Sequence, residues 1–472
     1  MKRRFGLGIV LLLVAMAVGA WAQDEAPPPS SAPAGGAAAA GDDSSQPSQS
    51  TGPKPEYTEV DPGKSLNFLN EAVNHSNLNL AMTVQGSYDT NIATFATKRL
   101  PQASYLIAPH IGFSQYRPKL ALNLSYDGGL GIYQELSNSN NYSQTGTADI
   151  LYQLTSRWQA HASDRYAYSA DPFGSYFTIV GQPSPNDPNP NTYVPFANTQ
   201  QNLAELDFAH QFSRHDSLTF TGSENFRRYS NYATNISFQG GLYNLIAWSG
   251  GANYSHRLSA QLSVGGGYNW TSLDFSHGQQ RSGISAFQGF VNYQYSKSLS
   301  ISGWAGPEHI TAKTILIFQN RYFILYQSDW VPAFGLNIGW QGLRQSFTVG
   351  ASRQVSDGGG LLATTTAYNG NLAYRRKLNA RWDGVISVNY GDNASFAASN
   401  LNKQLFPNRD YTLLQTALQL TRQITPAMTA NLSYAYIRET QKNIYFVNAS
   451  PTYNDSRIWI SIQYNWNHPL GR

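Results

Sequence analysis

The sequence predicts an all-β protein, a transmembrane antiparallel β-barrel of about 18 strands (roughly 16 to 20), with short periplasmic turns and long extracellular loops. Three observations predict this class. Segments of about ten residues alternate between apolar and small polar side chains, as a tilted strand does when one face meets lipid and the other meets water. Charged residues make up only 13% of the chain, about half the share in an average soluble domain. Tight turns with a basic residue recur roughly every 40 residues, the length of two strands and one long loop.

The N-terminal part of the chain has the layout of an exported protein. Residues 1–22 predict a signal peptide, because Lys2, Arg3 and Arg4 precede an apolar stretch and an Ala-x-Ala cleavage site ends at Ala22. The alternative is an anchor that stays attached, which requires a longer apolar span. Residues 23–64 are rich in Pro, Ala and Ser, with too little apolar surface to fold, and predict a disordered periplasmic arm. The barrel is expected over residues 65–472.

The alternation is clearest in a hairpin over residues 412–436. Its first arm alternates from Thr412 to Thr421, a tight turn over 422–426 follows, and the second arm presents an apolar face from Met428 to Tyr436. Similar arms are expected over residues 78–91, 120–127, 261–270, 346–352, 382–390 and 456–467.

The turns and loops give the strand count. The basic residues that mark the tight turns are Arg117, Arg157, Arg214, Arg257, Lys297, Arg344, Lys377 and Arg422. Longer connections are expected near residues 92–101, 134–141, 172–198, 230–241, 274–283, 307–327, 357–363, 392–408 and 441–455. The resulting strand number is even and both ends of the barrel fall on the side of the tight turns, as in bacterial outer-membrane barrels. A soluble propeller is the alternative, but no blade signature recurs, and aromatic residues stand at the ends of the apolar faces, where interfacial girdles would lie.

Composition and motifs exclude several kinds of chemistry. The chain has no cysteine, so disulfides and thiol catalysis are excluded. Its formal charge of +4 includes three basic residues of the leader, which gives no support for nucleic-acid binding. The nine histidines show no metal-ligand spacing, so neither a metal nor a cofactor is expected. The segment from Gly283 to Phe287 lacks the closing glycine of a nucleophile elbow, and no enzyme is predicted, although a catalytic group assembled from separate strands is left open.

The longest connection, residues 171–198, is a candidate constriction loop. It contains six prolines and several aromatic side chains, and it follows the position of the inward-folded third loop of general porins. An exposed surface loop is the equal alternative. The candidate residues of the constriction are Asp171, Phe173, Tyr176, Phe177, Asp187 and Tyr193.

A second candidate is a set of charges on the strands beside that loop. Arg165, Glu205, Asp207 and Arg227 fall on the small polar register and are expected to line a water-filled lumen, because charge facing lipid costs about 2–4 kcal/mol for Arg or Lys. A structural network of ion pairs is the alternative. Asp164 falls on the lipid-facing register, which indicates a bulge or a slipped register there.

The end of the first strand resembles a known family. Gly86-Ser87-Tyr88-Asp89-Thr90-Asn91, followed by Ser104, Tyr105 and Pro109, is similar to the first hairpin of the outer-membrane β-barrel porin family of the BBP2 type. The resemblance implies a Gram-negative outer-membrane protein, and several members of the family occur in settings linked to exopolysaccharide. One departure is the tail from His468 to Arg472, because such barrels usually end on an aromatic residue.

These observations favour passive diffusion of small hydrophilic solutes, with a neutral wall of Asn, Gln, Ser and Thr favouring uncharged ones. The alternative is a non-conducting or export-associated barrel, such as an exopolysaccharide secretion partner, scaffold or adhesin. The expected partners are outer-membrane lipid, lipopolysaccharide and the barrel-assembly machinery, and a homo-oligomer is left open.

Overall fold

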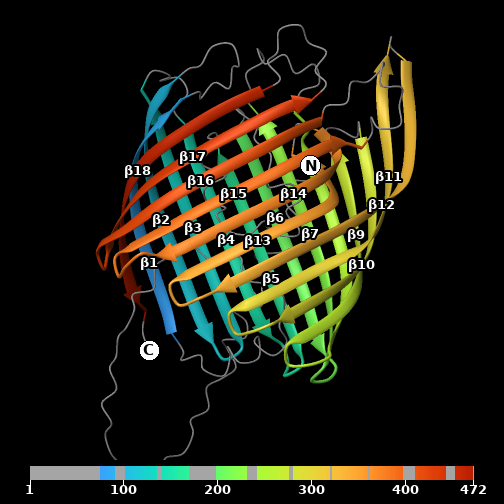
Figure 1. Ribbon diagram of the computed structural model, residues 1–472, viewed down its shortest axis with the longest axis horizontal. Helices are drawn as coiled ribbons and strands as arrows, with labels where there is room; N and C mark the ends of the chain where they lie inside the picture. Colours follow the sequence, from blue (N-terminus) through green and yellow to red (C-terminus); the bar gives the residue numbers. More distant parts are fainter. Residues whose placement is uncertain are drawn as a thin grey trace, which may run out of the picture. The chain divides into compact units, whose positions relative to one another are not determined.

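The computed structural model describes residues 75–90, 101–134, 141–169, 198–230, 242–275, 280–318, 321–359, 362–396, 410–442 and 452–470. Within them, 18 antiparallel strands form one sheet, and β1 pairs with β18 as well as with β2, so the sheet closes on itself (Figure 1). The predicted fold class and strand number are confirmed. The predicted signal peptide and periplasmic arm lie outside the described residues.

Each strand pairs with its neighbours in the chain. The strands are β1 (His75–Asp89), β2 (Gln102–Arg117), β3 (Leu120–Tyr133), β4 (Asn141–Gln153), β5 (Trp158–Ser169), β6 (Asn198–Gln211), β7 (Asp216–Ser230), β8 (Leu245–Arg257), β9 (Leu262–Phe275), β10 (Gln280–Gln294), β11 (Leu299–Phe318), β12 (Arg321–Gln341), β13 (Gln345–Gly358), β14 (Leu362–Lys377), β15 (Trp382–Ser395), β16 (Asp410–Thr425), β17 (Met428–Lys442) and β18 (Thr452–Pro469). The eight short connections lie at one end of the barrel, the turn end, where β1 begins and β18 ends. The opposite end of the barrel, where β1 ends and β18 begins, is called the loop end.

The two faces of the strands differ as the alternation predicts. Large apolar side chains occupy one register and are exposed on the outside; Val84 and Ile107, for example, are Cα partners on β1 and β2. The other register faces the lumen, because its side chains reach each other across the barrel, as Ser282 of β10 reaches Thr364 of β14. No helix of the described residues is long and apolar enough to span a membrane. The outward apolar side chains include Met82, Leu124, Tyr126, Trp248, Tyr268, Trp270, Val291, Leu336, Ile386, Leu418, Leu432, Ile458, Ile460 and Ile462.

Five of the short turns are built in the same way. A Ser, Thr or Asn just after the strand accepts hydrogen bonds from the backbone N–H groups two and three residues later, which is the local geometry that these side chains favour. The acceptors are Thr155, Ser213, Ser259, Ser296 and Asn379. In the turn at Ser213, the Asp216 carboxylate also accepts hydrogen bonds from the Ser213 and Tyr254 hydroxyls, both at 2.6 Å.

Removing one of these acceptors is expected to weaken the barrel measurably. Ser259→Ala deletes the Oγ that accepts from the N–H groups of Gln261 and Leu262 at 3.2 and 3.0 Å, and we expect a loss of about 1 kcal/mol in the free energy of unfolding. Urea unfolding of the refolded protein measures it. Gln261→Ala, in the same turn, removes no such acceptor and should change stability by less than half as much; equal losses would contradict this role.

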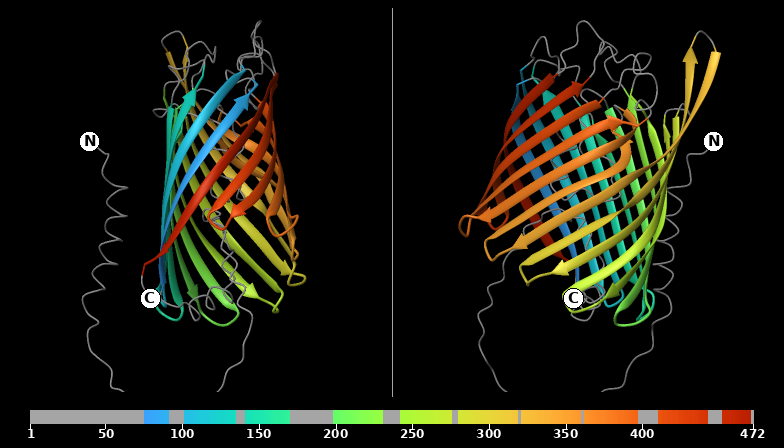
Figure 2. Two further views of the ribbon diagram at one scale, coloured as in Figure 1. Left: turned by 90° about the vertical axis from the view of Figure 1, so that its left-hand side faces the viewer. Right: turned by 45° about the vertical axis from the view of Figure 1, so that its right-hand side comes forward.

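Two predicted connections were wrong. Residues 307–327 do not form a long irregular loop: β11 and β12 continue through them as a paired ribbon up to the Phe318–Arg321 pair, and the ribbon extends beyond the other strands (Figure 2). The turn marked by Arg422 lies further on, because β16 continues to Thr425 and the irregular pairing between Gln423 and Thr425 absorbs one residue.

Candidate functional site: the lumen and the β13–β14 tip

The barrel wall splits between β12 and β13. These strands pair only from Gln341–Ser346 to Phe334–Arg353, whereas β12 stays paired with β11 and β13 stays paired with β14 well beyond that point. On the loop-end side of the split, β11 and β12 continue as the extended ribbon. The end of the β13–β14 hairpin, residues 354–359 and 362–366, is called the tip here.

A proline explains where the split occurs. Two residues beyond the Arg353–Phe334 pair, the same register would bring Val355 opposite Pro332, which has no N–H to donate to a neighbouring strand. Instead, the Val355 N–H donates to the Glu308 carboxylate of β11 at 2.9 Å. The Arg353 guanidinium donates to the carbonyl oxygen of Pro332 and to the Tyr368 hydroxyl, which fixes the base of the tip.

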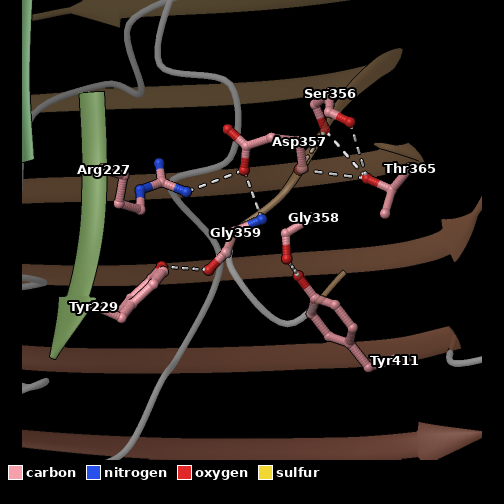
Figure 3. Close-up of polar contacts among 8 residues, drawn as sticks. All are labelled: Arg227, Tyr229, Ser356, Asp357, Gly358, Gly359, Thr365 and Tyr411. Atoms are coloured by element: carbon pink, nitrogen blue, oxygen red, sulfur yellow. Dashed lines mark hydrogen bonds and ion pairs between the residues drawn. The ribbon is translucent and has the colours of Figure 1, made fainter. Parts of the chain in front are cut away.

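The tip lies inside the barrel and contacts strands that are not its neighbours (Figure 3). Arg227 of β7 donates to Asp357 at 3.0 Å, and the Tyr229 hydroxyl donates to the Gly359 carbonyl at 2.6 Å. The Tyr411 hydroxyl of β16 lies 3.4 Å from the Gly358 carbonyl. In the closed sheet β7 is six strands away from β13, so its contacts with the tip pass through the lumen, whereas β16 is only two strands away from β14.

The ion pair at the tip is almost completely buried. The side chains of Arg227 and Asp357 are 6% and 1% exposed. The same Asp357 oxygen accepts from the Gly359 N–H at 2.6 Å, so it closes the turn and holds the arginine at once. Gly359 has a φ of 60°, a conformation that side-chain-bearing residues rarely adopt.

An apolar cluster surrounds the tip. Val355 and Ala363 of the tip are buried among side chains from the inner faces of β8 to β11, so the tip packs against this part of the wall near the loop end. The other members of the cluster are Leu245, Ala247, Leu273, Phe275, Ile284, Ile310, Ala312 and Phe396.

Away from the tip, the lumen wall is polar. On β4 to β6, His161 lies between Asp149 and Asp207, at 2.9 and 3.1 Å. On β2 and β3, His110 Nδ1 lies 2.7 Å from Asp127. Each of these three aspartates therefore lies beside a histidine that can carry the opposite charge.

The four predicted pore-lining residues are placed differently from one another. Asp207 bonds His161, and Glu205 is buried and accepts a 3.4 Å hydrogen bond from the Ser163 hydroxyl. Arg227 belongs to the ion pair of the tip. Arg165 pairs in register with Thr147 and Leu203. A pore-lining role for these four residues stays a prediction.

The other predictions near this wall have different outcomes. Pairing of β5 is continuous on both sides of Asp164, so the bulge expected there is absent, and Asn202 donates to its carboxylate at 2.5 Å. The candidate constriction residues Asp171, Phe173, Tyr176, Phe177, Asp187 and Tyr193 lie outside the described residues. The tip was missed by sequence reasoning; the signal that could have indicated it is Asp357 followed directly by three glycines.

In the described part of the chain, no group of three or more His, Cys, Asp or Glu side chains is placed to hold a metal ion.

Comparisons with known proteins give a likeness to solved structures. No family model matches the chain and no curated protein matches it, so the resemblance to the BBP2 type stays a prediction. The structure is similar to Acinetobacter baumannii OccAB3, with 8% identity over 83% of this chain and 99% of that chain and a TM-score of 0.41. It is also similar to Pseudomonas aeruginosa OpdQ, with 9% identity, 84% and 98% coverage and a TM-score of 0.41. For Pseudomonas aeruginosa OpdK with vanillate, the identity is 8% over 82% of this chain and 99% of that chain, with a TM-score of 0.40.

Proposed function

We propose that this protein is an outer-membrane channel for passive diffusion of small hydrophilic solutes. The observation that carries the proposal is the closed 18-strand barrel with large apolar side chains outside and a polar inner face. A bilayer accepts a β-structure only when its backbone groups are paired in a closed barrel, and barrels of this size leave room for water unless something fills them. Bilayer lipid and lipopolysaccharide would contact the outer face, and the barrel-assembly machinery would insert it.

The proposed solutes are uncharged. Many charges on the described inner face are neutralised within the wall, as Arg375 is by Asp383 at 2.6 Å and Arg457 by Asp89 at 2.9 Å. Such paired charges create little net field along a pore, whereas the Asn, Gln, Ser and Thr side chains between them can exchange hydrogen bonds with hydroxyl groups of a passing solute.

A second candidate is a non-conducting barrel that serves export or acts as a surface scaffold. The position of the tip inside the lumen, in contact with β7 to β11, favours it, because a barrel whose lumen is blocked by its own chain does not conduct. The two candidates therefore differ in whether the tip is a permanent plug.

Planar-bilayer conductance distinguishes them. We would compare the full-length protein with a variant in which residues 356–365 are replaced by Asn-Gly, a two-residue hairpin turn that keeps the Val355–Thr366 pair. Insertion is checked by the heat-dependent shift of the folded barrel in gels. A channel predicts stable current steps from at least the shortened variant and swelling of proteoliposomes in neutral sugars. Silence from both correctly inserted proteins would contradict the channel and favour the second candidate.

A further inference from the structure

We propose that the β13–β14 tip is a displaceable gate, closed in this structure and held shut by its contacts with β7 and β10. The inference rests on the proposed channel function, since a gate requires a pore.

The first argument is that the tip is attached to the wall along one edge only. Its β13 edge has no strand pairing with β12 beyond Arg353, whereas its β14 edge keeps the Thr365–Ser395 and Thr366–Ala394 pairs with β15. Movement of the tip would therefore open this short pairing with β15 and leave the pairing that closes the barrel below intact. Pairing between β13 and β14 continues to the Gly358–Leu362 pair, so the tip can move as one hairpin. The Arg353 contacts with Pro332 and Tyr368 fix its base and place the hinge there.

The second argument is that, beside the apolar packing of Val355 and Ala363, the side-chain contacts that hold the tip to β7 and β10 are few and polar. They join Arg227 to Asp357, Tyr229 to Gly359, and Ser282 to Thr364, whose hydroxyl oxygens are 2.6 Å apart. Each has its partner on a strand that stays in the wall. Water can replace such contacts once the tip moves.

The third argument is that the closed position leaves polar groups unsatisfied. Asn225 of β7 is 3% exposed, and neither its amide oxygen nor its amide nitrogen has a hydrogen-bond partner. Gln280 of β10 is 6% exposed, and its amide nitrogen is also without a partner. Burying such groups opposes closure. Each residue lies two positions along its strand from a residue that contacts the tip, Arg227 on β7 and Ser282 on β10. We therefore expect displacement of the tip to let water reach these amides, which would offset part of the free energy lost with the polar contacts of the tip.

An engineered disulfide tests the gate directly, because the chain has no cysteine of its own. The Ser282 and Thr364 hydroxyls are 2.6 Å apart, which makes these positions the natural choice for a disulfide, whose Cβ atoms lie about 3.5–4.5 Å apart. The double variant S282C/T364C would lock the tip to β10 when oxidised and release it in dithiothreitol. The matched control is S125C/T147C, whose hydroxyls are also 2.6 Å apart but join the neighbouring strands β3 and β4.

Single-channel recording of the full-length protein gives the result. We expect oxidised S282C/T364C to show an open probability at least about tenfold below that of its reduced form, and reduction to leave the control unchanged. Mass spectrometry verifies each disulfide. As a second variant that leaves the packing intact, Tyr229→Phe removes only the hydroxyl that donates to Gly359, and we expect it to raise open probability about fivefold.

The outcomes separate the gate from the channel. If the verified disulfide leaves current unchanged and Tyr229→Phe behaves like the wild type, the gate is overturned while the channel stands. If the wild type, the reduced variant and the shortened-tip variant are all silent in the bilayer, both the channel and the gate are overturned.

Discussion

Replacing Arg227 by methionine is expected to destabilise the inward position of the tip by about 3–5 kcal/mol. The guanidinium and the Asp357 carboxylate are both almost fully buried, 3.0 Å apart. Methionine fills similar space but leaves the carboxylate buried without this counter-charge, which is the costly half of breaking a buried pair. Hydrogen–deuterium exchange should show faster exchange in residues 354–366 while the strands below Arg353 keep their protection.

Two further variants make the interpretation specific. Arg375→Met breaks the ion pair between Arg375 and Asp383 in the wall, but the Arg375 side chain is 38% exposed. We therefore expect a destabilisation of at most about 1 kcal/mol and no change in the exchange rate of the tip. Adding Asp357→Asn to Arg227→Met removes the stranded charge while keeping an oxygen for the Gly359 N–H, and should recover part of the loss. Equal exchange of the tip in Arg227→Met and Arg375→Met would show that this pair does not hold it.

The strand architecture could be predicted because it depends on local periodicity. Each arm that alternates apolar and small residues becomes a strand with the apolar face outward, as Leu262 to Trp270 does in β9. The turns are equally local, since a Ser, Thr or Asn bonds N–H groups only two and three residues away. The ribbon of β11 and β12 was missed because Pro307 and the charged residues Glu308, Lys313 and Arg321 are typical of a loop. In the structure Pro307 and Pro332 lie opposite each other, and pairing continues on both sides of them.

The candidate site could not be predicted because its contacts are not local. Arg227 and Asp357 are 130 residues apart, and only closure of the barrel brings β7 across from the end of β13. The inward register of Arg227 was readable from the alternation, but its partner was not. The effect of Pro332 depends on which residue of β13 lies opposite it, and that register is set by pairs near the turn end, such as Gln341 with Ser346.

Replacing Arg457 by methionine is expected to lower the free energy of unfolding by about 3–5 kcal/mol, through the seam where the sheet closes. Arg457 of β18 and Asp89 of β1 are Cα partners at the loop end of this seam. Two guanidinium nitrogens donate to the same Asp89 oxygen at 3.1 and 2.9 Å, and the side chains are 5% and 2% exposed. Breaking the ion pair leaves a buried carboxylate where β1 pairs with β18. This is the strand pairing that closes the sheet into a barrel.

Arg281→Met is the matched control for this seam. Arg281 also bonds its cross-strand partner, Asp274, through two nitrogens at 3.0 and 2.8 Å, but its side chain is 67% exposed on the outside between β9 and β10. We expect Arg281→Met to lower the free energy of unfolding by at most about 1 kcal/mol. Urea unfolding and the fraction of heat-shifted barrel measure both variants.

The size of that difference decides what closes the barrel. A large loss confined to Arg457→Met would mean that the seam needs a buried charge pair in addition to its backbone hydrogen bonds. It would also give a structural role to Asp89, which lies within the first-strand ending that resembles the porin family. Equal small losses in both variants would mean that the backbone pairing of β1 with β18 closes the barrel by itself, and that the Asp89–Arg457 pair adds no more than an exposed pair does.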